Sequence, residues 1–184
     1  MKNQTIDKNS REYLERQRAS GRNNLLLVII FTVINLVMLL TESNTYFLFS
    51  ASVPYYFTAF GMGMDMGMGG SVFTVTALVI SALILVAYLL CWIFGKKRKG
   101  WLIAALVLFI VDSVLLVLMT LAMEMLTESI IDLVFHAWVV VSLCQALSAD
   151  KKLKALPEEI VEEAPAAPVA APVTEEPWNQ PDKQ

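Results

Sequence analysis

Three ionisable side chains interrupt an otherwise apolar part of the chain, and they are the residues whose types and spacing could do chemistry. Asp112 lies within the apolar run 101–123, and Asp132 and His136 lie four residues apart within the run 126–147. A charge at the centre of a bilayer costs about 2.5–3.5 kcal/mol on insertion scales, so such residues usually pair, lose their charge or serve a pathway. Histidine titrates near neutral pH, which makes a proton relay one candidate chemistry.

The order of these residues predicts a contact between Asp112 and His136. If the two runs are helices joined by a short acidic turn near Glu124 and Met125, they form an antiparallel pair. Asp112 then lies at the same depth as Ala137, the neighbour of His136. A hydrogen bond to the imidazole would offset part of the cost of burying the carboxylate. The pair has two interpretations, a structural contact and a station on a pathway.

Two polar residues of the earlier apolar runs fall at a similar depth, and they extend this pair to a layer. Asn35 and Ser81 both lie near the middle of their runs, on the sparse polar stripe of each predicted helix. Such a layer could conduct protons or cations, or it could join helices through hydrogen bonds worth about 0.6 kcal/mol each. The predicted layer consists of Asn35, Ser81, Asp112, Asp132 and His136.

A methionine-rich run at 61–70 is the second candidate site. Thioether sulfur is a soft donor suited to Cu(I). The alternative interpretation is packing, because Gly63, Gly67 and Ser71 recur every four residues, a spacing that lets membrane helices approach closely. The candidate metal ligands are Met62, Met64, Asp65, Met66 and Met68.

Four long apolar segments must position these residues. The chain of 184 residues is 57% hydrophobic and 17% charged, with a mean hydropathy of +0.60, which lies outside the range of soluble domains. A bilayer core of ~30 Å needs about 20 helical residues. We therefore predict an all-α fold, an integral membrane four-helix bundle made of two antiparallel hairpins. Its transmembrane domain covers 23–147, with spans at 23–41, 72–94, 101–123 and 126–147 and an outer loop at 42–71.

The distribution of Lys and Arg predicts the orientation of this domain. The stretches 41–71 and 124–128 contain neither residue, whereas the N-terminal segment and the stretches 96–99 and 151–154 hold all but one. Because cytoplasmic loops carry an excess of positive charge, we expect both termini in the cytoplasm. Two cysteines at the cytoplasmic ends should stay reduced there.

An aromatic stretch at 46–60 could be a fifth span, but this would place the basic stretch 96–99 outside. We expect instead an interfacial or re-entrant segment on the outer face, broken at Pro54.

Both ends of the chain are polar. The basic segment 1–22 contains Asn9 and Ser10, which could cap a short helix resting on anionic headgroups; a solvated flank is the alternative. The segment 148–184 is rich in Pro, Ala and Glu and is predicted to be a disordered cytoplasmic tail. Trp178 within it is a candidate contact for a cytoplasmic partner, and a solubilising tail or linker is the interpretation that the composition favours.

The sequence resembles, in general type only, the small multipass proteins of bacterial cytoplasmic membranes. It has no Gly-x-Ser-x-Gly motif, and its single His and two distant Cys lack zinc-ligand spacing, so we predict no enzyme and no cofactor. We expect a non-enzymatic accessory, scaffold or sensory subunit of the cell membrane. The alternative is a conduit for protons or cations, copper among them. Expected partners are the lipid bilayer and a second copy or another membrane protein, with no nucleic acid.

Overall fold

A computed structural model describes residues 10–43, 45–124 and 129–157, and its regular elements within these ranges are all α-helices. Four of them, all but α2, are long and apolar enough to cross a membrane. The all-α prediction is therefore confirmed for the described residues. The predicted tail beyond residue 157, with Trp178, lies outside them. The helices are α1 (Arg11–Leu40), α2 (Ser52–Met68), α3 (Val72–Phe94), α4 (Lys99–Ala122) and α5 (Ile130–Ala155).

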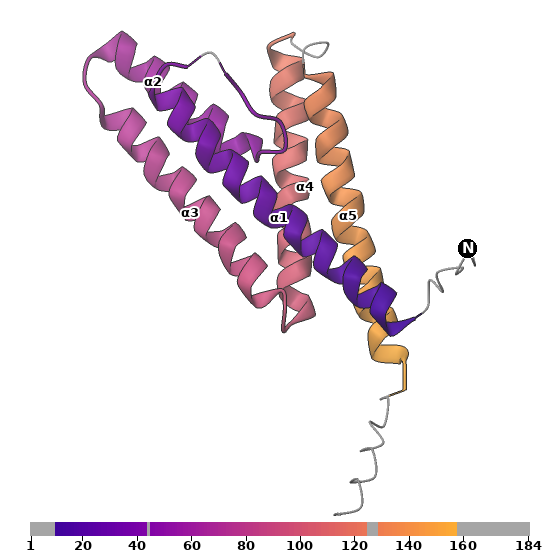
Figure 1. The fold of residues 1–184 in the computed structure, drawn as a ribbon. Coiled ribbons are helices and arrows are strands. Elements are labelled where there is room, and N and C mark those ends of the chain that lie inside the picture. The colour runs from indigo at the N-terminus through magenta and orange to yellow at the C-terminus, as the bar shows by residue number, and fades with distance from the viewer. Residues whose placement is uncertain (1–9, 44, 125–128, 158–184) are drawn as a thin grey trace, which may run out of the picture.

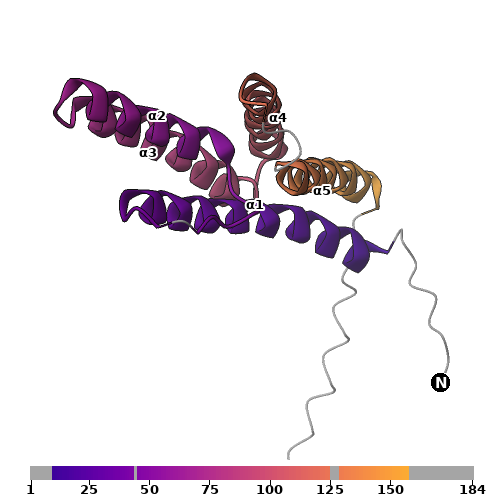
Figure 2. The same ribbon diagram turned by 90° about the horizontal axis from the view of Figure 1, so that it is seen from above.

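The helices form two splayed pairs joined by α1 (Figures 1 and 2). The first pair is α2 with α3, and the second is α4 with α5. The N-terminal half of α1 packs along α5, and its C-terminal half lies against α2 and α3 (Figure 2). The main partner of α1 is thus the last helix rather than α3, because α2 and the segment before it lie beside its C-terminal half. The predicted pairing of the first two long helices is not the main contact.

The start of α1 and the end of α5 both extend beyond the predicted membrane spans. Ser10 caps α1, its hydroxyl accepting from the backbone N–H of Tyr13 at 3.3 Å, and the helix then runs unbroken for 30 residues, or ~45 Å. The expected short N-terminal helix and the first long helix are therefore one element. At the other end, α5 continues to Ala155, so the start of the segment 148–184 belongs to this helix and not to the predicted tail.

The segment predicted as the loop 42–71 contains a helix of 17 residues, α2. Pro54 does not break it, because proline in the first turn of a helix removes no intrahelical hydrogen bond. After α1 the chain turns back along it, so that α2 begins beside the middle of α1 and runs outward again (Figure 1). This path is re-entrant with respect to the bundle, and we call residues 46–54 the re-entrant segment.

Charge separates the two ends of the bundle. Every Lys and Arg of the described residues lies toward the end where α1 begins, α3 turns into α4 and α5 finishes. We call this the basic end. The opposite, acidic end carries Glu42, Asp65 and Glu124. Between them lies an apolar core that includes Leu25, Tyr88, Phe109 and Leu143.

Close helix contacts occur at two glycines that the four-residue spacing did not single out. A Cβ at Gly21 would lie 2.6 Å from Cβ of Ala146 on α5, and one at Gly61 would lie 2.8 Å from the carbonyl oxygen of Phe73 on α3. Gly63 and Gly67 have no such neighbour within 4 Å. The packing interpretation of the glycine-rich run therefore holds for Gly61 and not for the residues on which it was based.

Gly61→Ala should destabilise the protein by about 1–3 kcal/mol, because the new methyl group meets backbone that must shift. Gly63→Ala on the same helix is the matched control, and it should be neutral or stabilising by up to about 1 kcal/mol because it only raises helix propensity. Thermal unfolding of both variants in detergent, followed by tryptophan fluorescence, measures the difference. Equal midpoints for the two variants would contradict the close approach of α2 and α3.

Candidate functional site

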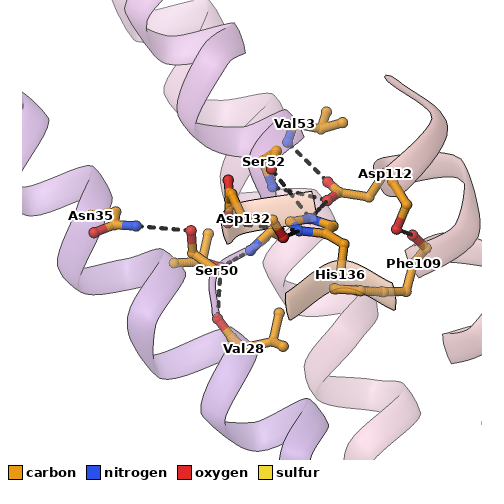
Figure 3. Close-up of polar contacts among 12 residues, drawn as sticks. Val28, Asn35, Ser50, Ser52, Val53, Phe109, Asp112, Asp132 and His136 are labelled. Atoms are coloured by element: carbon orange, nitrogen blue, oxygen red, sulfur yellow. Dashed lines mark hydrogen bonds and ion pairs between the residues drawn. The ribbon is translucent and has the colours of Figure 1, made fainter. Parts of the chain in front are cut away.

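The five residues of the predicted polar layer are all buried, with exposed fractions between 0% and 6%. They do not form one continuous ring. Instead, side chains from α1, α4 and α5 contact the re-entrant segment and the first turn of α2 from different sides (Figure 3). Ser81 on α3 also contacts the first turn of α2. The layer therefore surrounds that segment, and we call the side chains that contact it the socket.

Helix α1 holds the descending chain through two side chains. Asn35 donates from Nδ2 to the carbonyl oxygen of Phe47 at 2.7 Å and accepts from its N–H at 2.8 Å, and it also donates to the hydroxyl of Ser50. Thr32, one turn away, accepts from the N–H of Ala51 at 2.7 Å. These bonds replace water for backbone groups that have no strand or helix partner here.

Asp112 on α4 caps the N-terminus of α2. Its Oδ2 accepts from the N–H of Ser52 and its Oδ1 from the N–H of Val53, each at 2.9 Å. The local cap position is Ala51, whose side chain cannot accept a hydrogen bond, so a carboxylate from another helix takes that role. A negative charge at this position also interacts favourably with the helix dipole.

His136 makes the predicted contact with Asp112. Its Nε2 lies 3.1 Å from Oδ2 of Asp112 and 3.3 Å from the hydroxyl of Ser52. Its Nδ1 lies 2.9 Å from the carbonyl oxygen of Asp132, and the ring stacks on Phe109 with centroids 5.0 Å apart. Both ring nitrogens face oxygens, the carbonyl of Asp132 and the carboxylate of Asp112. Both contacts are hydrogen bonds when each ring nitrogen carries a proton, or when Nδ1 carries one and a second proton is shared between Nε2 and Asp112.

Ser81 on α3 binds a different side of the same turn. Its hydroxyl donates to the carbonyl oxygen of Pro54 at 3.1 Å and lies 3.1 Å from the hydroxyl of Thr58. The structure thus gathers Asp112, Asp132 and His136 into one cluster, with Asn35 and Ser81 on separate sides of the re-entrant segment.

Tyr46 connects this cluster to the acidic end. Its hydroxyl donates to Oδ2 of Asp132 at 3.2 Å, and burial together with the charge of Asp132 raises the pKa of Tyr46 above its ordinary value. Tyr46 also lines a cleft of about 440 Å³ with Glu42, Tyr55 and other residues of the acidic end. Polar groups therefore lead from this cleft through Asp132 to His136.

The same series of polar groups does not continue along the core toward the basic end. The residues that α5 buries between His136 and Asp150 are Val139, Leu143, Ala146 and Ala149, a stretch of roughly 20 Å along the axis. The buried residues of α1 at this level, Leu25, Val28 and Ile29, are also apolar. The polar groups at this level are the half-buried pair of Asn24 and Ser142, 2.6 Å apart, and the buried hydroxyl of Tyr88. Within the described residues no hydrogen bond joins them to the polar cluster, so a mainly apolar layer separates the cluster from the basic end.

Asp65, a predicted metal ligand, caps the N-terminus of α3 in the same way that Asp112 caps α2. It accepts from the N–H groups of Phe73 and Thr74 at 3.1 and 2.7 Å. Burial alone would raise the pKa of Asp65, but the hydrogen bonds from Thr74 and Phe73 lower it below its ordinary value. The carboxylate thus has a structural role.

The four methionines of the run lie on α2, where alternate residues point about 200° apart. Met62 and Met66 therefore share one face, and Met64 and Met68 share another. Met66 and Met68 are 77% and 68% exposed. Copper binding stays a prediction, and the helix limits convergent sulfur donors from this run to these pairs.

Several residues of the socket were missed in the sequence. Thr32 lies three residues before Asn35 and so on the same face of α1, which was a usable signal. Ser50 and Ser52, the two small polar residues within the aromatic stretch, were a second signal. The backbone N–H groups that Asp112 binds have no signature in the sequence.

In space, the imidazole of His136 lies between the hydroxyl of Ser52 and Asp132, as in a serine hydrolase triad, but two features oppose catalysis. Nε2 of His136 is shared with Asp112, which lies slightly closer than the Ser52 hydroxyl. The N–H groups of Ser52 and Val53, which would otherwise form an oxyanion hole, are bound by the carboxylate of Asp112.

Comparison with known proteins yields no family model, no curated protein and no solved structure that matches this chain. Its function must therefore be inferred from the geometry of the described residues.

Asp112→Asn should destabilise the protein by about 1–3 kcal/mol. The carboxylate accepts from two backbone N–H groups, one on each oxygen, whereas an asparagine would turn its amide NH₂ toward one of these donors. Ser113→Ala is the control, because it removes only a bond to the carbonyl oxygen of Phe109 within α4. Chemical unfolding in mixed micelles would contradict the capping role if Asp112→Asn and Ser113→Ala had equal midpoints.

Proposed function

We propose that this chain is a multipass protein of the cell membrane, of the bacterial cytoplasmic type, that serves as a non-enzymatic accessory, scaffold or sensory subunit. One observation carries the proposal: the buried polar side chains bind the re-entrant segment and the start of α2, and not a vacant site. Most of their hydrogen-bonding capacity is used in assembly, and the exception among the described residues is Oδ1 of Asp132, which is buried without a hydrogen-bond partner.

Membrane insertion is supported by the outward faces of the long helices. Large apolar side chains are exposed along them, for example Leu83 at 64%, Leu118 at 56% and Val134 at 63%. Apolar surface of this extent is not left in water by monomeric soluble proteins. A bilayer provides the apolar surroundings that these faces need.

An orientation with both termini in the cytoplasm is supported by the charges at the two ends. The basic end contains the start of α1 and the finish of α5, and positively charged residues favour the cytoplasmic side. The acidic end, with the α2–α3 turn, would then face outward.

Labelling of single cysteines tests this topology. Cys91 and Cys144 are first replaced by alanine, and Ser43→Cys and Lys152→Cys are then introduced separately; both positions are exposed. An impermeant maleimide should label Ser43→Cys in intact cells and Lys152→Cys only after permeabilisation. The reverse pattern would overturn the orientation, and labelling of both in intact cells would place the ends on the same side.

A surface suited to a partner supports the accessory role. α2 and α4 leave an apolar groove of about 700 Å³, lined by Tyr56, Phe57, Leu115, Met119 and neighbouring residues. Because it opens where the two helix pairs diverge, such a groove can receive an acyl chain or a helix of another membrane protein, or of a second copy.

A conduit for protons or cations is the second candidate, and the polar groups from the acidic cleft to His136 favour it. The apolar layer around Val139 and Leu143 opposes it, because an ion crossing this layer would lose its polar partners. In this conformation the polar groups form a path from the acidic end that stops at His136.

Flux measurements separate the two candidates. Proteoliposomes containing the wild-type chain, Tyr46→Phe or Tyr55→Phe should show the same low proton leak, because no polar path crosses the apolar layer. Tyr46→Phe removes the hydroxyl that contacts Asp132 but keeps the ring, and Tyr55→Phe controls for loss of a neighbouring hydroxyl. A wild-type flux that falls in Tyr46→Phe and not in Tyr55→Phe would establish the conduit and overturn the accessory role.

A further inference from the structure

A cleft at the basic end gathers positive charge between three parts of the chain. It has a volume of about 390 Å³ and lies between the start of α1, the α3–α4 turn and the end of α5. Two acidic residues, Glu15 and Asp150, also line it. The cationic side chains at its wall are Arg11, Arg18, Arg22, Lys96 and Lys154.

Two of these cations pair with the acidic residue Asp150 and hold the walls together. Arg18 pairs through Nε with Asp150 at 3.1 Å and donates to the carbonyl oxygens of Gly95 and Lys96. Lys154 pairs with the second oxygen of Asp150 at 3.1 Å. Arg18 thereby connects α1, the α3–α4 turn and α5, so the shape of the cleft does not depend on a ligand.

Arg22 is different, because its charge has no acidic partner among the described residues. Its Nε is buried and makes no hydrogen bond within them, and its guanidinium lies 5.7 Å from the ring centroid of Trp92. Nε1 of Trp92 is likewise buried without a partner in this part of the chain. Arg22 lines the cleft, and its charge has no counter-charge within the described residues. An anion in the cleft that accepts from its terminal N–H groups would therefore be stabilising.

We propose that this cleft binds a phosphate group, with Arg22 as its principal donor and Lys96 and Arg11 completing the positive surroundings. A guanidinium presents paired N–H donors in a plane that matches two phosphate oxygens. Positive charge exceeds negative charge at the wall, which also favours an anion.

The phosphate has two chemical sources, an anionic lipid headgroup and a free phosphate compound. Basic pockets between helices on the cytoplasmic side of a membrane bind lipid headgroups, and tryptophans mark the level of the headgroups. Trp92 and Trp101 both lie at this end of the helices. The lipid source rests on the proposed membrane insertion, whereas the phosphate chemistry does not.

Ligand-induced stabilisation of the purified full chain tests the proposal. The chain in a neutral maltoside detergent is titrated with phosphatidylglycerol, with phosphatidylcholine and, separately, with inorganic phosphate, and the unfolding midpoint is followed. Stabilisation by phosphatidylglycerol alone identifies a lipid headgroup, and stabilisation by inorganic phosphate identifies the free group as sufficient. Equal stabilisation by phosphatidylcholine and phosphatidylglycerol without any phosphate effect, or none by any probe, would overturn the site.

Matched variants separate a built site from general attraction to a positive surface. Arg22→Gln and Arg16→Gln each remove one positive charge from α1, but Arg16 is 78% exposed, pairs with Glu12 and does not line the cleft. Arg22→Gln should weaken apparent binding roughly tenfold or more, and Arg16→Gln should change it little.

Equal losses in the two variants would contradict the site. If Arg22→Gln does not fold, Lys96→Gln tests the site in its place. Lys96 lines the cleft, is exposed, and its side chain makes no hydrogen bond or ion pair within the described residues. Lys96→Gln should then weaken phosphate binding relative to Arg16→Gln, and the absence of such a difference would overturn the proposal. A membrane flux or topology result contrary to the proposed function leaves this binding measurement unaffected.

Discussion

The structure depends on one constraint, the burial of a helix N-terminus in the middle of an apolar bundle. The first N–H groups of α2 have no partner within their own helix, so acceptors must come from elsewhere in the chain. Asp112 supplies two acceptors and Thr32 a third for the residue before the helix. Without these side chains the chain would have to keep this segment at a surface, and α2 could not occupy its position beside α3. The backbone groups that they bind therefore explain Thr32, Asn35, Ser81 and Asp112, whereas Asp132 and His136 bind side chains of the same region.

A cap by a carboxylate from another helix occurs twice, and each cap links two helices of the bundle. Asp112 joins α4 to the start of α2, and Asp65 joins α2 to the start of α3. In both places the local cap residue makes no side-chain cap, so a carboxylate from elsewhere completes the helix. Each such bond fixes both the register and the depth of one helix against another. Apolar packing alone does this weakly in a membrane, because lipid is as apolar as the side chains.

The sequence predicted the elements whose signals are local. Long apolar runs located the four long helices, and the bounds of α3 agree with the prediction. Depth matching brought Asp112 and His136 together because both lie in helices joined by a short turn. α2 was missed because its glycines and Pro54 resemble a loop, although proline is compatible with a first turn. Nor could the sequence reveal its caps, since an acceptor sixty residues away from its donor leaves no spacing pattern. Gly61 was overlooked for the same reason, as its neighbour lies on another helix.

The pairing of α1 with α5 determines the order in which the bundle can be completed during synthesis. α1 emerges first, and its side chains Thr32 and Asn35 can bind the re-entrant segment soon afterwards. Asp112 follows about sixty residues later, and the face of α1 around Gly21 finds its neighbour Ala146 only when the last helix has been made. A nascent chain therefore carries an uncapped α2 until Asp112 has been made, and an uncovered α1 face for most of its translation. During that interval the side chains and backbone groups that later bind one another have no partner within the chain.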